Sequence, residues 1–332
     1  MKNQFIMFIY NLSKYLVRHK DGKVFSKLLS MLYKRKVSKA RKTLKKLEDV
    51  EIKKNLDLKA IGVSANKSEI QLNPNDEGLS AQLLAYEFRE PINCYLLSQF
   101  IKKENFDVII DAGSNIGYFP IVELESGAKK VVVIEPVPET FRFLHKNIER
   151  YSNVSEVNAA VSVHDQEETL FIAAQKNLST IIPDEDYLKI AKTSIIDKMT
   201  VQALTFQSII DKVGINGQRA LLRMDIEGYE RVIGYNLPDE IKAISLEFHR
   251  PVIGYEASMK LLDHWEESGF RAVTLSRELD GLSPFIKRFG LQWVLRIYEL
   301  MAKRIFFNPD RNLINEILTL NKESPHICLL RD

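Results

Sequence analysis

The sequence predicts an α/β protein whose central sheet is mostly parallel. Short apolar runs that suit strands buried on both faces recur along residues 106–332, and segments of helical periodicity separate them. This alternation is typical of βαβ units. Three of the runs end in an acidic residue, at Asp111, Glu135 and Asp225. Because open α/β sheets bind ligands beyond the carboxyl ends of their strands, we expect the functional site at these residues.

The composition indicates a globular protein of ordinary polarity. A chain of 332 residues can form one large α/β domain with an extension. Hydrophobic residues make up 45% and charged residues 27%, and no apolar run is long enough to span a bilayer. Cys94 and Cys328 give neither a disulfide framework nor a metal-ligand spacing, so we expect both to be buried. These features favour a cytoplasmic location.

Residues 1–56 form a basic N-terminal arm. They contain 16 Lys or Arg and 4 Asp or Glu, so their charge is +12, whereas the rest of the chain carries −9. Apolar residues recur there at helical spacing, with a break at Asp21-Gly22, which predicts a helical arm. Such an arm can pack on its own domain, or lie on an anionic membrane surface or a partner, and the first interpretation is slightly favoured. Nucleic acid is not expected, because no aromatic residue interrupts the basic run at 34–54.

Residues 57–105 are a lead-in to the α/β domain, which spans 106–332. Asn73–Gly78 has the composition of a loop. Leu79–Leu97 follows a largely helical pattern that Pro91 interrupts.

The first strand of the domain runs into a glycine-containing turn at Asp111–Gly117. Gly113 permits a sharp turn and close ligand approach, and Gly117 permits close packing of the following helix. The dinucleotide fingerprint is absent, because Ser114 and Asn115 lie between the only two glycines. A pyrophosphate requires bare backbone amides, whereas S-adenosylmethionine has no phosphate and presents cationic groups and a ribose diol. The motif therefore fits S-adenosylmethionine better, although an ordinary strand–turn–helix is the alternative.

A second acid follows the next strand. We expect a helix over Tyr118–Ser126 and a buried strand over Val131–Ile134, which ends at Glu135. Glu135 lies 24 positions after Asp111, at the tip of the neighbouring strand, where a carboxylate can hold both hydroxyls of a ribose. The alternative is an acid facing the start of the helix that follows Pro138.

The third strand is expected over Val154–Val161, and Asn158 lies near its end. This residue either hydrogen-bonds an adenine or caps a turn, and the sequence does not separate the two. Thr169–Ala173 and Thr200–Leu204 resemble short added strands around a long polar loop, Gln175–Asp197. We expect that loop to close over the substrate.

The fourth strand, Ala220–Asp225, leads into three carboxylates within six residues. Asp225, Glu227 and Glu230 are costly to crowd unless cations or a metal compensate them. In the functional interpretation Asp225 faces the reacting centre, and Glu227 and Glu230 shape the acceptor side or start the next helix. The alternative is a helix N-terminus that carries acids.

The fifth strand, Ala243–Phe248, is followed by His249. Glu247 and His249 alternate with Phe248, so their side chains should point the same way. A histidine with a near-neutral pKa can deprotonate a hydroxyl, although a structural histidine is as plausible. The remaining elements expected are a helix at Tyr255–Ser268, a strand at Gly269–Leu275, an apolar helical insert at Phe285–Phe307 and a final strand at His326–Leu330.

Three segments together resemble the FkbM-type methyltransferases: Asp111–Gly117, Glu135 with the residues that follow it, and Leu221–Glu230. The third is the most distinctive, because many related methyltransferases lack it. The resemblance covers about residues 87–275. It implies a Rossmann-like class I methyltransferase fold with a mostly parallel seven-stranded sheet, S-adenosylmethionine as cofactor, and O-methylation of a hydroxyl on a small molecule, sugar or glycan. In this family the segment corresponding to Arg89–Pro91 covers the cofactor, so Glu90 either touches ligand or is an exposed charge near a helix start.

The sequence thus predicts two sets of site residues and assigns no metal ligand. Two other interpretations stay open. One is a non-catalytic cofactor-binding scaffold that docks to a membrane or partner through the arm. The other is a nucleic-acid methyltransferase, although the Asn/Asp-Pro-Pro-Tyr tetrad of amino-methylating enzymes is absent. A nicotinamide oxidoreductase is disfavoured by the missing third glycine. The residues expected to bind cofactor are Asp111, Gly113, Asn115, Gly117, Glu135 and Asn158, and those expected on the acceptor side are Asp225, Glu227, Glu247 and His249.

Overall fold

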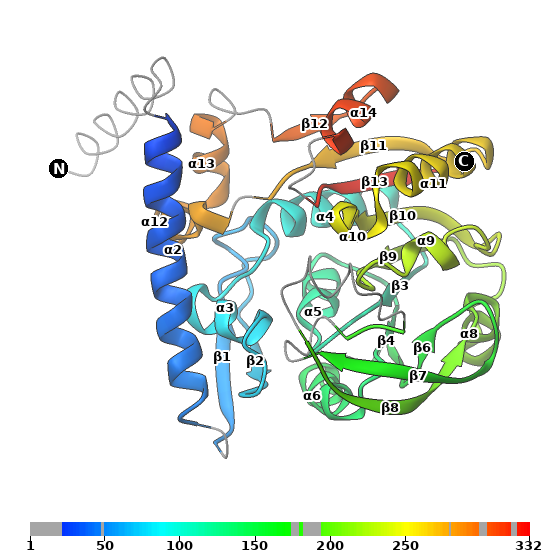
Figure 1. Ribbon diagram of the computed structural model, residues 1–332, viewed down its shortest axis with the longest axis horizontal. Coiled ribbons are helices and arrows are strands. Elements are labelled where there is room, and N and C mark those ends of the chain that lie inside the picture. Colours follow the sequence, from blue (N-terminus) through cyan, green and yellow to red (C-terminus); the bar gives the residue numbers. More distant parts are fainter. Residues whose placement is uncertain are drawn as a thin grey trace.

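The computed structural model describes residues 22–47, 50–173, 179–181, 194–278, 280–298, 304–319 and 324–332. Its largest element is an eight-stranded sheet (Figure 1). In spatial order the strands are β12 (Ile305–Phe307), β11 (Arg271–Ser276), β13 (His326–Leu330), β10 (Ile241–Glu247), β9 (Ala220–Met224), β3 (Val108–Ala112), β4 (Val131–Ile134) and β5 (Val154–Val157).

The predicted α/β architecture is confirmed. Strands β10, β9, β3, β4 and β5 pair in parallel, whereas β13 is antiparallel to both β10 and β11. Every residue of β3 and β4 is buried, as expected for apolar strands covered on both faces. The carboxyl ends of the five parallel strands therefore meet at one edge of the sheet.

Helices cover both faces of this sheet. Alternate residues of β3 belong to different cores: Ile109 packs in one, and Val108 and Ile110 pack in the other. The first core includes side chains of α4 (Pro91–Glu104), α5 (Tyr118–Glu125) and α6 (Pro138–Ile148). The second includes side chains of α8 (Phe206–Val213) and α11 (Tyr255–Glu267).

Two of the predicted elements are wrong in detail. The expected third strand is divided: β5 ends at Val157, and β6 (Ala160–Val161) joins a separate three-stranded sheet with β8 (Ile195–Leu204) and β7 (Gln166–Ala173). The expected helical insert at Phe285–Phe307 is also divided. Gly290 ends its first helix with φ +85°, and its last residues form β12, an eighth strand that pairs with β11.

The predicted loop Gln175–Asp197 falls mostly outside the described residues, and its end from Ile195 onward is strand β8. Both cysteines are free and buried, as expected. The remaining elements are α9 (Glu230–Ile233), α10 (Arg250–Ile253), η2 (Asp280–Leu282), α12 (Ser283–Phe289), α13 (Leu291–Tyr298) and α14 (Arg311–Thr319).

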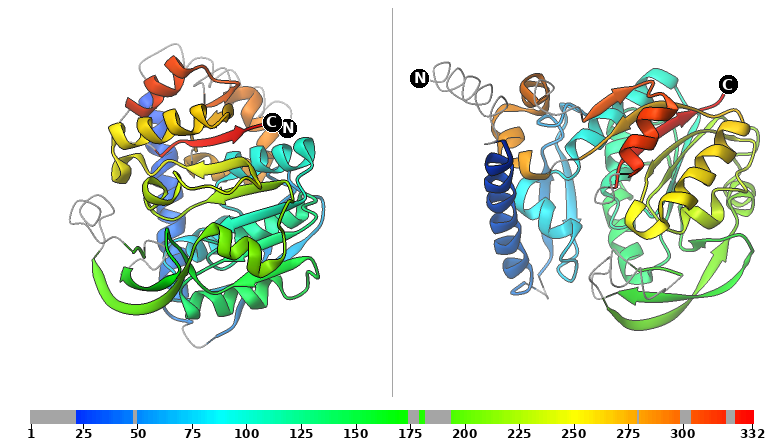
Figure 2. Two further views of the ribbon diagram at one scale, coloured as in Figure 1. Left: turned by 90° about the vertical axis from the view of Figure 1, so that its right-hand side faces the viewer. Right: turned by 45° about the horizontal axis from the view of Figure 1, so that its top comes forward.

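The described part of the arm packs on the protein itself. Helix α2 (Gly22–Leu44) lies along α3 (Leu79–Tyr86) at one side of the molecule (Figures 1 and 2). Val37 and Leu44 are buried in the first core, and the ring of Tyr33 stacks on that of Tyr86 at 5.4 Å. These contacts favour the packed-arm interpretation for α2. Residues 1–21 lie outside the described residues.

The arm is not helical to its end. Residues Ile52–Leu56 form β1, which pairs antiparallel with β2 (Ser68–Leu72). Lys53 and Asn55 are exposed and alternate with more buried neighbours, which is the period of two of a β-strand. The basic composition of the segment hides this period in the sequence. Among the described helices, none is both long enough and apolar enough to cross a membrane.

Candidate functional site

Two adjoining pockets lie at the carboxyl edge of the parallel strands. They share Gly113, Asn115, Asp225 and Glu227. The first has an empty volume of about 690 Å³, which includes open solvent at its mouth. Its walls also include the carboxylate of Glu135 and the apolar residues Ile134, Val137, Ala159, Ala160, Leu170 and Ile226. The second pocket is also lined by Leu79, Arg89, Ser114, Tyr118, Phe119 and Arg223.

Glu135 is held in the first pocket by backbone amides. Its Oε2 accepts a hydrogen bond from the N–H of Asn115 at 3.1 Å, and its Oε1 accepts one from the N–H of Val137 at 3.0 Å. Burial raises the pKa of Glu135 to about 7, despite these two bonds. Each oxygen keeps a second lone pair, so the carboxylate has unused acceptor capacity. The Glu135 carboxylate is therefore an acceptor that fits the two hydroxyls of a ribose, and the apolar walls suit an aromatic base.

The two motif glycines have close protein neighbours. At Gly113, with φ +88°, a Cβ would lie 2.1 Å from the carbonyl oxygen of Asp225, so only glycine allows the two loops to meet. At Gly117, with φ +89°, a Cβ would lie 2.9 Å from Cδ1 of Leu144 on α6. Gly113 lines both pockets, whereas Gly117 lines neither of them.

Asp111 is buried beneath the pockets and lines neither of them. Its Oδ1 lies 2.9 Å from Nη1 of Arg223, the residue opposite it on β9, and its Oδ2 is buried without a hydrogen bond from any described residue. Burial raises the pKa of Asp111, and the Arg223 charge opposes that rise. The same guanidinium reaches Asp225 Oδ2 at 3.0 Å and lies 3.6 Å from the ring centroid of Phe119. Asp111 therefore orients Arg223, which orients Asp225.

Asn158 supports the loop that carries Glu135. Its Nδ2 donates to the carbonyl oxygens of Glu135 and Pro136 at 2.8 and 3.3 Å. Asn158 lines neither pocket. The geometry favours its turn-capping role, and a contact with adenine stays a prediction.

Three carboxylates surround His249. Its Nδ1 lies 3.1 Å from Oε1 of Glu230, whose side chain is fully buried. Its Nε2 lies 3.6 Å from Asp225 Oδ1 and 3.5 Å from Glu227 Oε2, the two acids that line the pockets. Glu230 thus contacts the histidine from behind, and the other nitrogen faces the site.

The pKa of His249 differs from the near-neutral value expected. Burial lowers this pKa, but the charges of Glu227 and Glu230 raise it by a larger amount, so the pKa lies well above 6.5. Burial also raises the pKa of Glu227. A cluster with more carboxylates than cations binds protons tightly, which favours the cationic form of His249.

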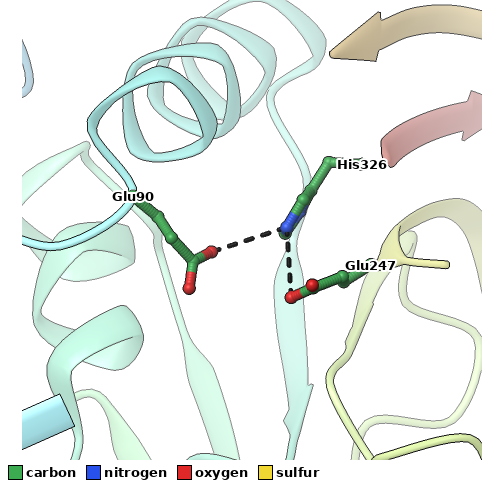
Figure 3. A group of neighbouring side chains, drawn as sticks. All are labelled: Glu90, Glu247 and His326. Carbon is green, nitrogen blue, oxygen red and sulfur yellow. Dashed lines mark ion pairs between the residues drawn. The ribbon is translucent and has the colours of Figure 1, made fainter. Parts of the chain in front are cut away.

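Glu247 contacts a second histidine. Its Oε2 lies 3.3 Å from Nε2 of His326, and Oε2 of Glu90 lies 3.5 Å from the same nitrogen. Both carboxylates point toward the imidazole in Figure 3. Glu90 is buried at the N-cap of α4, which excludes the exposed-charge interpretation.

Sequence reasoning missed two residues of this region. Arg223 could have been noticed as a charge within an otherwise apolar strand, because a buried charge usually has a partner. His326 gave no signal, since it appeared only as the first residue of the last strand.

The family model described as the methyltransferase FkbM domain matches residues 111–274. A comparison with curated proteins finds no match. Among solved structures, the chain resembles the O-methyltransferase from Bacillus cereus in complex with SAH, at 10% identity and a TM-score of 0.37, over 76% of this chain and 86% of that one.

Two further solved structures show a similar degree of likeness. The SAM-dependent methyltransferase from Agrobacterium tumefaciens matches at 7% identity and a TM-score of 0.37, over 80% of this chain and 67% of that one. The ribosomal protein L11 methylase from Lactobacillus delbrueckii subsp. bulgaricus matches at 10% identity and a TM-score of 0.34, over 74% and 81%.

The strand order, the pockets at the carboxyl edge and the domain match define a Rossmann-like methyltransferase that uses S-adenosylmethionine as its cofactor. The match of residues 111–274 to the methyltransferase FkbM domain supports the FkbM-type methyltransferase family. The resemblance seen in the sequence is thereby confirmed.

Proposed function

We propose that this methyltransferase O-methylates a hydroxyl of a small molecule, sugar or glycan. The observation that carries the proposal is the Glu230–His249 pair, in which Nε2 of His249 faces the pocket-lining acids Asp225 and Glu227. A hydroxyl must lose its proton as its oxygen is methylated, so a positioned base contributes directly.

The cofactor would be held by the first pocket and its shared wall. Glu135 would accept hydrogen bonds from the ribose, and the turn at Gly113 and Asn115 would contact the ligand through its backbone. When bound, S-adenosylmethionine supplies an electrophilic methyl group. Asp225, oriented by Arg223, would place a negative charge near that group.

His249 would act as the base through Nε2. Glu230 accepts the Nδ1 hydrogen bond and so fixes the tautomer with a free lone pair on Nε2 once the ring is neutral. The carboxylates raise the pKa of His249, so the neutral form of the imidazole becomes abundant only at higher pH. The base therefore becomes more effective on the alkaline side of neutrality.

Product analysis tests the proposal. The protein is incubated with S-adenosylmethionine labelled in its methyl group and with paired acceptors, methyl glycosides and the corresponding amino sugars. We expect labelled methyl ethers in equal amount to the S-adenosylhomocysteine released. Labelled N-methyl products alone, or no transfer to any hydroxyl while the cofactor binds, would contradict O-methylation.

Glu135→Ala should weaken S-adenosylhomocysteine binding by about 30- to 150-fold. The ribose diol donates two charge-assisted hydrogen bonds to the carboxylate, and their loss costs roughly 2–3 kcal/mol. Glu135→Gln keeps one acceptor and should lose less. The measurement is calorimetric titration of folded variants.

The matched control is Glu139→Ala, which removes an acid from the first turn of the following helix α6. Its affinity should not change. Since the pKa of Glu135 is about 7, wild-type affinity should also fall as the pH drops below that value, and Glu135→Gln should lose this dependence. Unchanged affinity in folded Glu135→Ala would exclude the ribose role.

A further inference from the structure

Glu90, Glu247 and His326 form a second group of histidine and carboxylates beside the proposed acceptor site (Figure 3). They come from three separate elements: the N-cap of α4, the end of β10 and the start of β13. One ligand atom from each lies within 4.8 Å of the others. The group lines neither pocket.

We propose that these three side chains bind a divalent cation of the kind that accepts mixed nitrogen and oxygen ligands, such as Mn²⁺. Two ligand atoms that are each about 2.1 Å from one ion, at tetrahedral or octahedral angles, lie roughly 3.0–3.5 Å apart. The imidazole nitrogen of His326 lies 3.3 and 3.5 Å from the two carboxylate oxygens. The donor atoms are therefore spaced as ligands of a single ion.

The ligands are held in position by the surrounding structure. Glu247 and His326 are directly opposite each other in the β10–β13 pairing, and the N–H of Phe248 donates to Pro325 just beyond them at 2.9 Å. Glu90 Oε2 accepts from Nδ2 of buried Asn93 at 3.3 Å.

The hydrogen-bond chain that begins at Glu90 and Asn93 extends by one more residue. Oδ1 of Asn93 accepts from Oγ of buried Ser276 at 2.9 Å. Hydrogen bonds of this kind, which orient a ligating carboxylate from behind, are a regular feature of metal sites.

A second group, Asp225, Glu227 and His249, has similar spacing but a different surrounding. Each group has one acid paired with an arginine: Asp225 with Arg223 at 3.0 Å, and Glu90, through Oε1, with Nε of Arg89 at 2.6 Å. The difference is that Asp225 and Glu227 line the pockets that ligands enter. The Glu90–Glu247–His326 group is separate from those pockets, so an ion there would not displace the cofactor. Glu247 and His249 are two residues apart at the end of β10, which places the ion next to the base.

Any role of the ion in methyl transfer, through its positive charge near the acceptor side, rests on the proposed function. The binding of the ion does not rest on it. The test therefore measures binding directly.

The test is titration of the metal-free full-length protein with Mn²⁺, followed by calorimetry and by the Mn²⁺ electron paramagnetic resonance signal. We expect one ion per chain. His326→Gln and Glu247→Gln should each weaken binding by at least about tenfold. His145→Gln is the matched control, because His145 also contacts a carboxylate, Glu156 at 2.9 Å, but is exposed and contacts no second carboxylate among the described residues.

His249→Gln distinguishes the two groups. Retained Mn²⁺ binding in His249→Gln, with loss in His326→Gln, supports the proposal. The reverse pattern, or no binding by the wild-type protein, overturns it and leaves His326 as an ion-pair partner of two glutamates. S-adenosylhomocysteine affinity and thermal melting of each variant establish folding, so failure of ion binding is distinguishable from failure of the methyl-transfer assay.

Discussion

Arg223→Met is expected to lower the free energy of unfolding by about 3–5 kcal/mol. Arg223 is buried between Asp111 and Asp225, with nitrogen–oxygen distances of 2.9 and 3.0 Å. Methionine fills much of the same volume, so the loss comes mainly from charge. The substitution leaves Asp111 buried without its cation. Asp111 also lies beside Glu123, whose two buried carboxylate oxygens have no hydrogen bond from a described residue. Burial raises the pKa of Glu123 strongly.

Urea unfolding measures this loss, and Arg311→Met is the matched control. Arg311 also contacts two acids, Asp263 and Glu266, but both of them are exposed, so its removal should cost less than about 1 kcal/mol. Asp111→Asn combined with Arg223→Met should be less destabilising than the sum of the single changes, because the buried charge is then gone. Equal losses in the two arginine variants would refute the buried-pair account.

His249→Gln is expected to lower kcat by about 10²- to 10⁴-fold, the range for removal of a positioned general base. Glutamine keeps polar contact with the surrounding acids but cannot take the proton. S-adenosylhomocysteine affinity should change little, because His249 lines neither pocket. Steady-state kinetics on the acceptor identified by product analysis, with His145→Gln as control, measures the effect.

The pH profile gives a sharper test of the same histidine. Three carboxylates, Asp225, Glu227 and Glu230, face His249, and its pKa lies well above 6.5. The rate should therefore rise with pH above neutrality as the ring loses its proton. Glu230→Gln removes one of the charges that raise this pKa, so the midpoint of the profile should move to lower pH. A midpoint that stays in place would exclude His249 as the titrating base.

The sequence indicated the parallel strands and the acids at their ends because both signals are local. The apolar runs at Val131–Ile134 and Ala220–Met224 are continuous, and each is followed directly by its acid. The positions of the cofactor pocket and of Asp225 and Glu227 follow from that pattern and from the rule for parallel sheets.

The histidine clusters could not be predicted in the same way. His326 meets Glu247 only because the last strand inserts antiparallel beside β10, a pairing that no local pattern specifies. The high pKa of His249 depends on Glu230, which reaches the ring from the helical turn after β9. The role of Arg223 likewise depends on its register opposite Asp111.

The position of β13 also limits the order in which the strands can join the sheet. β13 follows β11 in the chain but lies between β10 and β11, so it joins two strands that do not pair with each other. In the finished sheet β11 connects to β10 only through β13, so β11 and β12 cannot reach their final places before residues 326–330 have been synthesised. His326 is part of that strand, so the Glu90–Glu247–His326 group can form only after all residues that line the two pockets have been synthesised.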